Sequence, residues 1–156
     1  EQKIKRNYAL LLEHVNEEPL NGYAWFQLGL TLGQMGLVKE AEDAIKFAIN
    51  CGNLSDTIYS SSATALAQFA GNRRDFNESL RWAEASLEKA PNQIFTLTLK
   101  GFALLHLGRK VEAREALQSA LNLSRSSLTT MTTQSSGFDI VINESIILKG
   151  LEAADK

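Results

Sequence analysis

The sequence contains little of what builds disulfide-bonded, metal-binding or membrane-spanning proteins. It has one cysteine, Cys51, so no internal disulfide can form, and its only histidines, His14 and His106, leave no set of zinc ligands. No apolar run approaches the roughly 18 residues that a transmembrane helix requires. We therefore predict a chain with no disulfide, no metal ion, no cofactor and no transmembrane segment.

Excess charge of either sign is also missing. The 156 residues have a formal net charge of −2 and 22% charged side chains, which indicates neither a nucleic acid nor a membrane surface as partner. The first residues lack an initiator methionine and the apolar centre of a signal peptide, and they begin directly in an amphipathic pattern. We interpret the sequence as a piece of a longer chain and predict a cytoplasmic location.

Catalytic constellations are absent from the pattern. We assign neither histidine a carboxylate partner at helical spacing, and no strand followed by a G-x-x-x-x-G-K-[ST] or G-x-G-x-x-G order is present to hold a phosphate. We predict that these residues do not form an enzyme, although a catalytic domain upstream of residue 1 stays open.

Two prolines and helical spacing almost throughout predict an all-α protein. Seven positions of one helix pair recur 72 residues later in another pair, so the chain contains a repeat. The pair between them is weaker and lies 38 residues after the first and 34 residues before the third. The recurring positions are Trp25, Gly29, Leu32, Gly36, Ala41, Ile45 and Ala48, then Leu97, Gly101, Leu104, Gly108, Ala113, Leu117 and Ala120.

This pattern resembles the tetratricopeptide repeat family, whose 34-residue unit follows W-x2-L-G-x2-Y … A-x3-F … P. The first pair matches six signature positions, with leucine and isoleucine in place of the tyrosine and phenylalanine, and Pro91 ends the middle unit. The resemblance covers about residues 3–125 and implies a right-handed superhelical solenoid of antiparallel helix pairs.

The repeat phase divides the chain. Residues 1–20 are predicted to hold the second helix of a truncated preceding repeat, because Pro19 occupies the place of Pro91. Three helix pairs are expected at about 22–55, 56–93 and 94–125. The last part, 126–156, is predicted to be a Ser/Thr-rich linker and a C-terminal capping helix. That this last segment folds back into the groove is the alternative.

The middle pair departs from its neighbours in two ways. Its four extra residues are expected to lengthen its first helix by one turn, capped by Ser55 or Asp56, with a longer loop as the alternative. Arg74 stands where the other units have Gly36 and Gly108, which predicts a different turn geometry. The glycines within the first helices, Gly29 and Gly101, are predicted to permit close crossing opposite Ala41 and Ala113.

In a tetratricopeptide array the first helices line a concave groove, and their outward residues contact the ligand. We predict a ligand that is an apolar or amphipathic segment of a protein, held by aromatic side chains left exposed there. Apolar and amide side chains occupy the places of the clamp that binds chaperone C-terminal carboxylates, so no such clamp is expected. The predicted groove residues are Tyr23, Phe26, Leu30, Gln34, Thr64, Gln68, Phe95, Thr98, Phe102 and His106.

The sequence thus predicts a non-catalytic protein–protein interaction scaffold, possible pairing with a second copy being left open. The alternative is the C-terminal tail of a bacterial glycosyltransferase, since 6–29 is similar to the junction that often follows such a catalytic domain. A less favoured interpretation is anion binding, to nucleic acid or lipid, by a basic edge near the turns. Cations near helix C-termini also complement the helix dipole, which explains the same residues without a ligand. This edge comprises Lys39, Arg73, Arg74, Arg109 and Lys110.

Overall fold

A computed structural model describes the backbone of residues 2–130 and 137–156, and the side chains of 2–126 and 144–156. The described residues form helices joined by short connections, with no strand among them. The helices are α1 (Gln2–Glu17), α2 (Gly22–Gln34), α3 (Val38–Asn50), α4 (Asp56–Asn72), α5 (Phe76–Lys89), α6 (Ile94–His106), α7 (Lys110–Thr130) and α8 (Gly137–Asp155).

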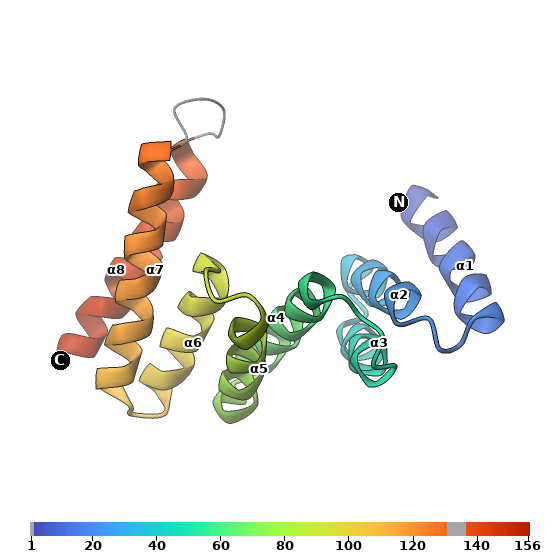
Figure 1. The fold of residues 1–156 in the computed structure, drawn as a ribbon, viewed down its shortest axis with the longest axis horizontal. Helices are drawn as coiled ribbons and strands as arrows, with labels where there is room; N and C mark the ends of the chain where they lie inside the picture. The colour runs from blue at the N-terminus through green and yellow to red at the C-terminus, as the bar shows by residue number, and fades with distance from the viewer. Residues whose placement is uncertain (1, 131–136) are drawn as a thin grey trace.

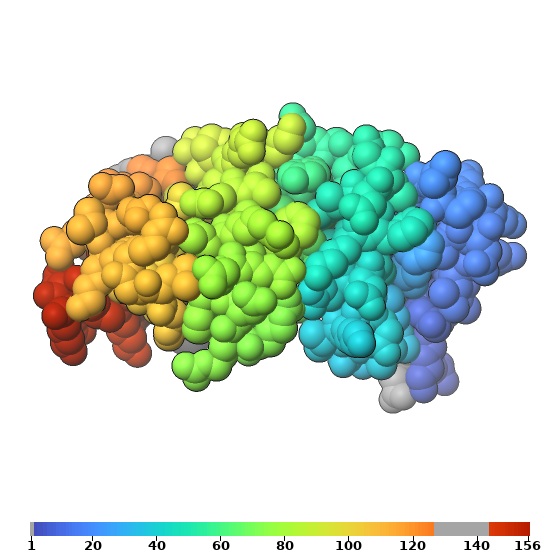
Figure 2. Space-filling view, turned by 90° about the horizontal axis from the view of Figure 1, so that it is seen from below, coloured from blue at the N-terminus to red at the C-terminus, as the bar shows by residue number. Residues whose placement is uncertain are grey.

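The helices stack in chain order into an arch whose two ends are the two ends of the chain (Figure 1). Helices α2, α4 and α6 lie on the inner side of the arch, and α3 and α5 lie on the outer side. Figure 2 looks at this outer side, where α3 (cyan) and α5 (green) lie between α7 and α1. The predicted all-α solenoid of helix pairs is confirmed.

Close crossing inside each pair depends on matched side-chain sizes. A Cβ at Gly29 would lie 2.5 Å from Ile45 Cγ1, and one at Gly101 would lie 2.5 Å from Leu117 Cγ. The predicted close approach is therefore present, although at Gly101 the side chain opposite is Leu117 and not Ala113. In the middle pair the equivalent positions are Ala67 and Ala83, both fully buried. Its weaker sequence pattern thus reflects a larger residue on one helix and a smaller one on the other.

The extra four residues of the middle pair lengthen its first helix, as predicted. Helix α4 has 17 residues, whereas α2 and α6 have 13 each. The Ser55 side chain caps α4 by accepting a hydrogen bond from the Ile58 amide at 3.3 Å. The alternative of a longer loop is not what the chain adopts.

The turn inside the middle pair was predicted to differ from the other two, and this prediction is wrong. Arg74 has φ +66°, beside +79° at Gly36 and +76° at Gly108. The amides of Arg74 and Asp75 donate to the carbonyls of Gly71 and Ala70, the bonding pattern of the other two turns. Since these bonds close the turn, arginine adopts the left-handed conformation here despite its side chain.

The C-terminal helix α8 packs against both α6 and α7, in the way that α6 packs against α4 and α5. Ile147 of α8 is fully buried and joins Leu117 and Leu121 of α7 in one apolar cluster. Helix α7 continues to Thr130, beyond the predicted end of the third pair, and the rest of the predicted linker before Gly137 lies outside the described residues. That 1–20 completes a preceding repeat stays a prediction.

Candidate functional site

One stripe of α2 faces the concave side of the arch and stays open to solvent. It contains Tyr23, Gln27, Leu30 and Gln34, spaced by about one helical turn, with Tyr23 53% and Leu30 39% exposed. The Gln27 amide donates to the Tyr23 hydroxyl at 2.9 Å and holds the ring along the helix. Three of these four residues were predicted from the repeat phase, whereas Gln27 was missed, although its one-turn spacing from Tyr23 could have indicated it.

The prediction that Phe26 is an exposed aromatic anchor is wrong, because only 6% of this residue is exposed. Phe26, Thr64 and Thr98 hold equivalent positions in the three first helices, on the flank of the exposed stripe. All three are buried or half-buried. The Thr98 hydroxyl donates to the Ile94 carbonyl of its own helix at 2.8 Å. The exposed stripe is therefore narrower than the sequence predicted.

Thr64 belongs to a buried network of hydroxyls between α4, α5 and α6. Its Oγ1 shares hydrogen bonds of 2.8 Å with the hydroxyls of Ser86 and Thr96. Ser86 is fully buried and also bonds Ser60, and the Gln93 amide donates to both serine hydroxyls at 2.8 and 3.0 Å. Thr64 is consequently committed to the interior and is not available to a ligand.

At the C-terminal end of the concave side the predicted residues have different environments. Phe95 is 51% exposed, and Gln68 on α4 is exposed as well. Phe102 is half-buried and packs with the α7–α8 cluster, because α8 covers this part of α6. The His106 ring stacks on Phe76, with centroids 4.1 Å apart. The prediction that Phe102 is an exposed groove aromatic is therefore wrong.

The inner helices carry almost no charge. No Asp, Glu, Lys or Arg occurs in α2, while α4 has only Asp56 and α6 only Lys100. Both are paired with side chains of α5, Asp56 with Lys89 and Lys100 with Glu84, each at 3.3 Å. The concave side is thus apolar and amide-rich, and the chain's acidic residues lie mainly on the other helices.

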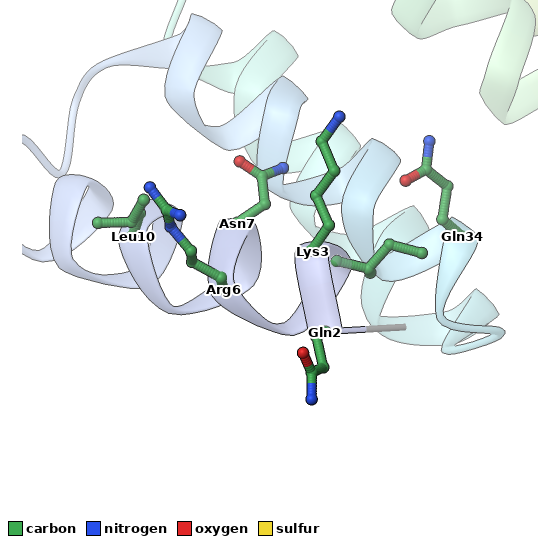
Figure 3. A pocket seen from close by; sticks show the side chains of 7 residues that line it. Gln2, Lys3, Arg6, Asn7, Leu10 and Gln34 are labelled. Carbon is green, nitrogen blue, oxygen red and sulfur yellow. The ribbon is translucent and has the colours of Figure 1, made fainter.

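A hollow of about 780 Å³ lies at the N-terminal end of this surface, between α1 and the end of α2 (Figure 3). The side chains of Lys3, Asn7 and Gln34 point to the same side of the two helices, whereas Gln2 points away. Arg6 and Leu10 complete the lining that the argument uses. The sequence prediction found Gln34 but missed the α1 residues, because it assigned α1 to a preceding repeat and considered only first helices as groove walls.

No protein-family model matches the chain, and no curated protein matches it. Solved structures do. YrrB, described as a TPR protein with an unusual peptide-binding site, aligns with a TM-score of 0.68 and 15% identity over 98% of this chain and 77% of that one. A MamA protein aligns at 0.70 and 12% over 98% and 81%. A MamA fragment from Desulfovibrio magneticus RS-1 gives 0.66 and 15% over 96% and 85%. The fold is a tetratricopeptide repeat fold.

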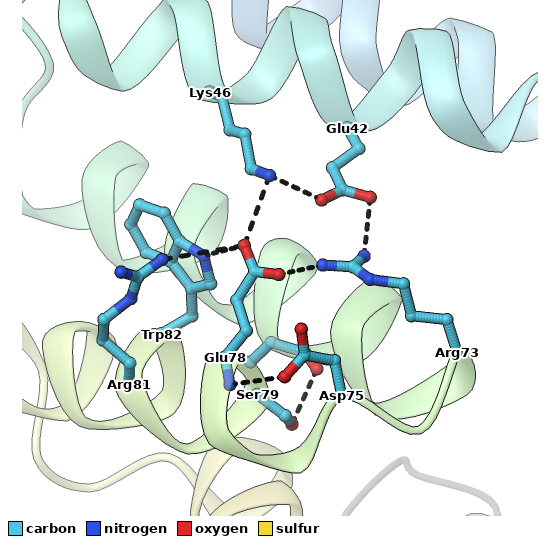
Figure 4. Close-up of polar contacts among 9 residues, drawn as sticks. Glu42, Lys46, Arg73, Asp75, Glu78, Ser79, Arg81 and Trp82 are labelled. Carbon is cyan, nitrogen blue, oxygen red and sulfur yellow. Dashed lines mark hydrogen bonds and ion pairs between the residues drawn. The ribbon is translucent and has the colours of Figure 1, made fainter.

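In this tetratricopeptide repeat fold, a closed ring of four charges joins the first two helix pairs on the side away from the groove (Figure 4). Lys46 lies 2.7 Å from Glu42 and 3.2 Å from Glu78. Arg73 Nη1 donates to Glu42 at 2.7 Å, and its Nη2 donates to Glu78. The hydrogen bond with Glu42 raises the pKa of Lys46, although burial opposes this effect. The ring links α3 to α5 and to the end of α4.

The basic edge predicted as an anion site is partly neutralised by acidic neighbours. Arg73 belongs to the four-charge ring, and Arg109 makes two hydrogen bonds of 2.8 and 2.6 Å to Glu112. The bond to Glu112 raises the pKa of Arg109. Two of the five cations are thus engaged with carboxylates, which weakens the case for a phosphate-binding edge.

The described residues contain no group of three or more His, Cys, Asp or Glu side chains placed to hold a metal ion. His14 does have a carboxylate partner, since its Nε2 lies 3.5 Å from Glu18 one turn away, and the prediction that it has none is wrong. Among the described residues, no helix combines the length and apolarity that crossing a bilayer requires.

Proposed function

We propose that the chain is a protein–protein interaction scaffold whose concave side binds an apolar or amphipathic segment of a partner. The observation that carries this proposal is the open stripe of apolar and amide side chains on helices with almost no charge. Tyr23, Leu30 and Phe95 expose apolar surface there, and exposed apolar surface with a polar rim is typical of binding sites.

The side chains of this stripe suit peptide recognition in two ways. Tyr23 and Phe95 are aromatic residues with few rotatable bonds, which bury large areas at a small entropic cost. Gln34 and Gln68 can donate to and accept from a peptide backbone. Because the inner helices contribute no unpaired charge, we expect affinity at this stripe to change little with salt. The peptide-binding site named for YrrB supports the same use of this fold.

The experiment is selection of displayed random 12-residue peptides against the purified chain, followed by affinity measurement with the Tyr23→Ala/Phe95→Ala variant. We expect this variant to lose binding while its circular dichroism and melting stay unchanged, because both rings are about half exposed. The matched control is Val38→Ala/Val111→Ala, which removes exposed apolar side chains near the turns. Peptides that bind the groove variant as well as the wild type would contradict the proposal.

The tail of a glycosyltransferase stays a prediction, and none of the described residues favours it over a plain scaffold. The cytoplasmic location and pairing with a second copy stay predictions as well. Identification of a catalytic domain on the same native polypeptide would support the tail, because the groove would then position an acceptor or a second subunit for that enzyme.

A further inference from the structure

We propose that the open flank of α1 binds a carboxylate at one end of the groove ligand. The basic flank, as we name it, consists of Lys3, Arg6, Asn7 and Leu10, and it lines the hollow beside Gln34. This inference rests on the proposed function, since it assigns a chemistry and a direction to the same ligand.

The flank is open because α1 uses another face for packing. Tyr8, Leu11 and Val15 recur at helical spacing and pack against the apolar cluster of α2 and α3. The basic flank lies to one side of this face, and its Leu10 is 55% exposed. Asn7 is the one flank residue that bonds to α2, where its amide donates to the Thr31 hydroxyl at 3.1 Å. The flank is therefore fixed in position relative to the inner stripe of α2.

Charge distinguishes this hollow from the rest of the concave side. Neither Lys3 nor Arg6 forms an ion pair or hydrogen bond with any residue that the structure describes, and no acidic residue lines the hollow. The two charges on the inner helices, by contrast, are both paired. The hollow is thus the part of the concave surface where a ligand would meet uncompensated charge, and that charge is positive.

The mixture of side chains indicates which anion fits. A guanidinium binds a carboxylate through two parallel hydrogen bonds, and an ammonium adds a second charge. Leu10 and the half-buried Ile4 provide apolar contact beside the cations. A nucleic acid needs a track of several phosphate contacts, whereas only two cations line this hollow. An amphipathic peptide with Asp or Glu at one end satisfies both parts of the surface.

The position of the flank also gives the ligand a direction. Gln34 belongs to both the hollow and the exposed stripe of α2, so the two surfaces are continuous. The acidic end would lie against α1, and the apolar residues would follow α2 toward Phe95 of α6.

The experiment repeats the random-peptide selection on the wild type, on Lys3→Gln/Arg6→Gln and on the matched control Lys39→Gln/Lys110→Gln. The control removes two charges near the turns, away from the hollow. We expect wild-type and control binders to be enriched in Asp and Glu at one end. The flank variant should lose this enrichment and bind the same acidic peptides about tenfold more weakly, which is about 1.4 kcal/mol. Wild-type affinity for them should fall with salt.

The outcomes separate this inference from the proposed function. Binders that need Tyr23 and Phe95 but show no acidic preference would overturn the basic flank and leave the groove intact. Loss of binding in neither groove nor flank variants would overturn both. A mass that rises with concentration in the wild type and not in Lys3→Gln/Arg6→Gln would assign the flank to a second copy, which also overturns the inference.

Discussion

The two junctions between neighbouring helix pairs are held by different chemistry. The N-terminal junction, between α2–α3 and α4–α5, is bridged by the ring of Glu42, Lys46, Arg73 and Glu78. A gap of about 650 Å³ lies beside this ring, lined in part by Phe69. The C-terminal junction, between α4–α5 and α6–α7, is held by the buried hydroxyl network. One repeat fold therefore joins its units by partly exposed charges in one place and by buried neutral groups in the other.

The difference predicts how each junction responds to conditions. Charges in contact with solvent are screened by salt, and their net contribution is small. Buried hydroxyls are not screened, but each one left without a partner is destabilising by about 1–3 kcal/mol. We expect the arch to loosen at its N-terminal junction when salt is raised, and to stay fixed at its C-terminal junction.

The largest effect should come from breaking the C-terminal junction with Ser86→Ala. Ser86 bonds Ser60, Thr64 and Gln93, so its removal leaves buried polar groups unpaired. We expect the free energy of unfolding to fall by about 1–3 kcal/mol, equally at low and high salt. Denaturant titration measures this, with Ser61→Ala, an exposed serine on the same helix, as the control. A loss no greater than that of the control would show that the network adds nothing to stability.

Breaking the N-terminal junction with Arg73→Gln should have a smaller effect that depends on salt. Arg73 is the member of the ring that joins both carboxylates from the end of α4. We expect a loss of about 0.5–1 kcal/mol at low salt that disappears near 1 M NaCl. The control Lys110→Gln removes one exposed cation elsewhere. A loss that persists unchanged at high salt would mean that Arg73 stabilises by packing.

Replacing Arg74 by glycine should sharpen the comparison by stabilising the unit between the junctions. Arg74 has φ +66°, which is unfavourable for a residue with a side chain and free for glycine. We expect the free energy of unfolding to rise by up to about 1 kcal/mol. The control Arg81→Gly, inside helix α5, should change it in the opposite direction by about the same amount. Thermal melting of both variants decides whether the turn is strained.

Acid should weaken the ring in a defined pH range. Burial alone would raise the pKa of Glu78, but the hydrogen bonds from Lys46 and Trp82 outweigh it, and the folded pKa lies below 4.5. A carboxyl with a lowered pKa stabilises the folded state above its unfolded pKa, and this is lost as pH falls through the folded pKa. The stability difference between wild type and Glu78→Gln should therefore shrink below pH 4.5. For Lys46, whose pKa is raised above 10.5, the loss occurs on the alkaline side.

The sequence predicted the parts of the fold that depend on residue size and spacing. The pairing of Gly29 with a larger side chain and the added turn of α4 follow from the repeat phase, because backbone approach and helical pitch are local properties. The turn at Arg74 could not be predicted from its residue type, since the hydrogen bonds that close the turn outweigh the preference of the side chain.

The candidate site was predicted only in part, since exposure depends on neighbouring helices. Tyr23 and Phe95 face outward as expected, but Phe26 lies on the flank of the stripe and Phe102 is covered by α8, whose position the repeat did not give. The cations of α1 became part of the surface only when α1 was placed beside Gln34.

One side chain of the third pair serves two helices at once. Leu117 fills the space left by Gly101 on α6, and a Cβ at Gly150 on α8 would come within 2.9 Å of its Cδ1. These three positions are therefore not free to vary independently, and their substitutions should be strongly non-additive. Among homologous chains, a smaller residue in place of Leu117 would permit larger residues at both glycines, so this trio should covary as a single unit of inheritance.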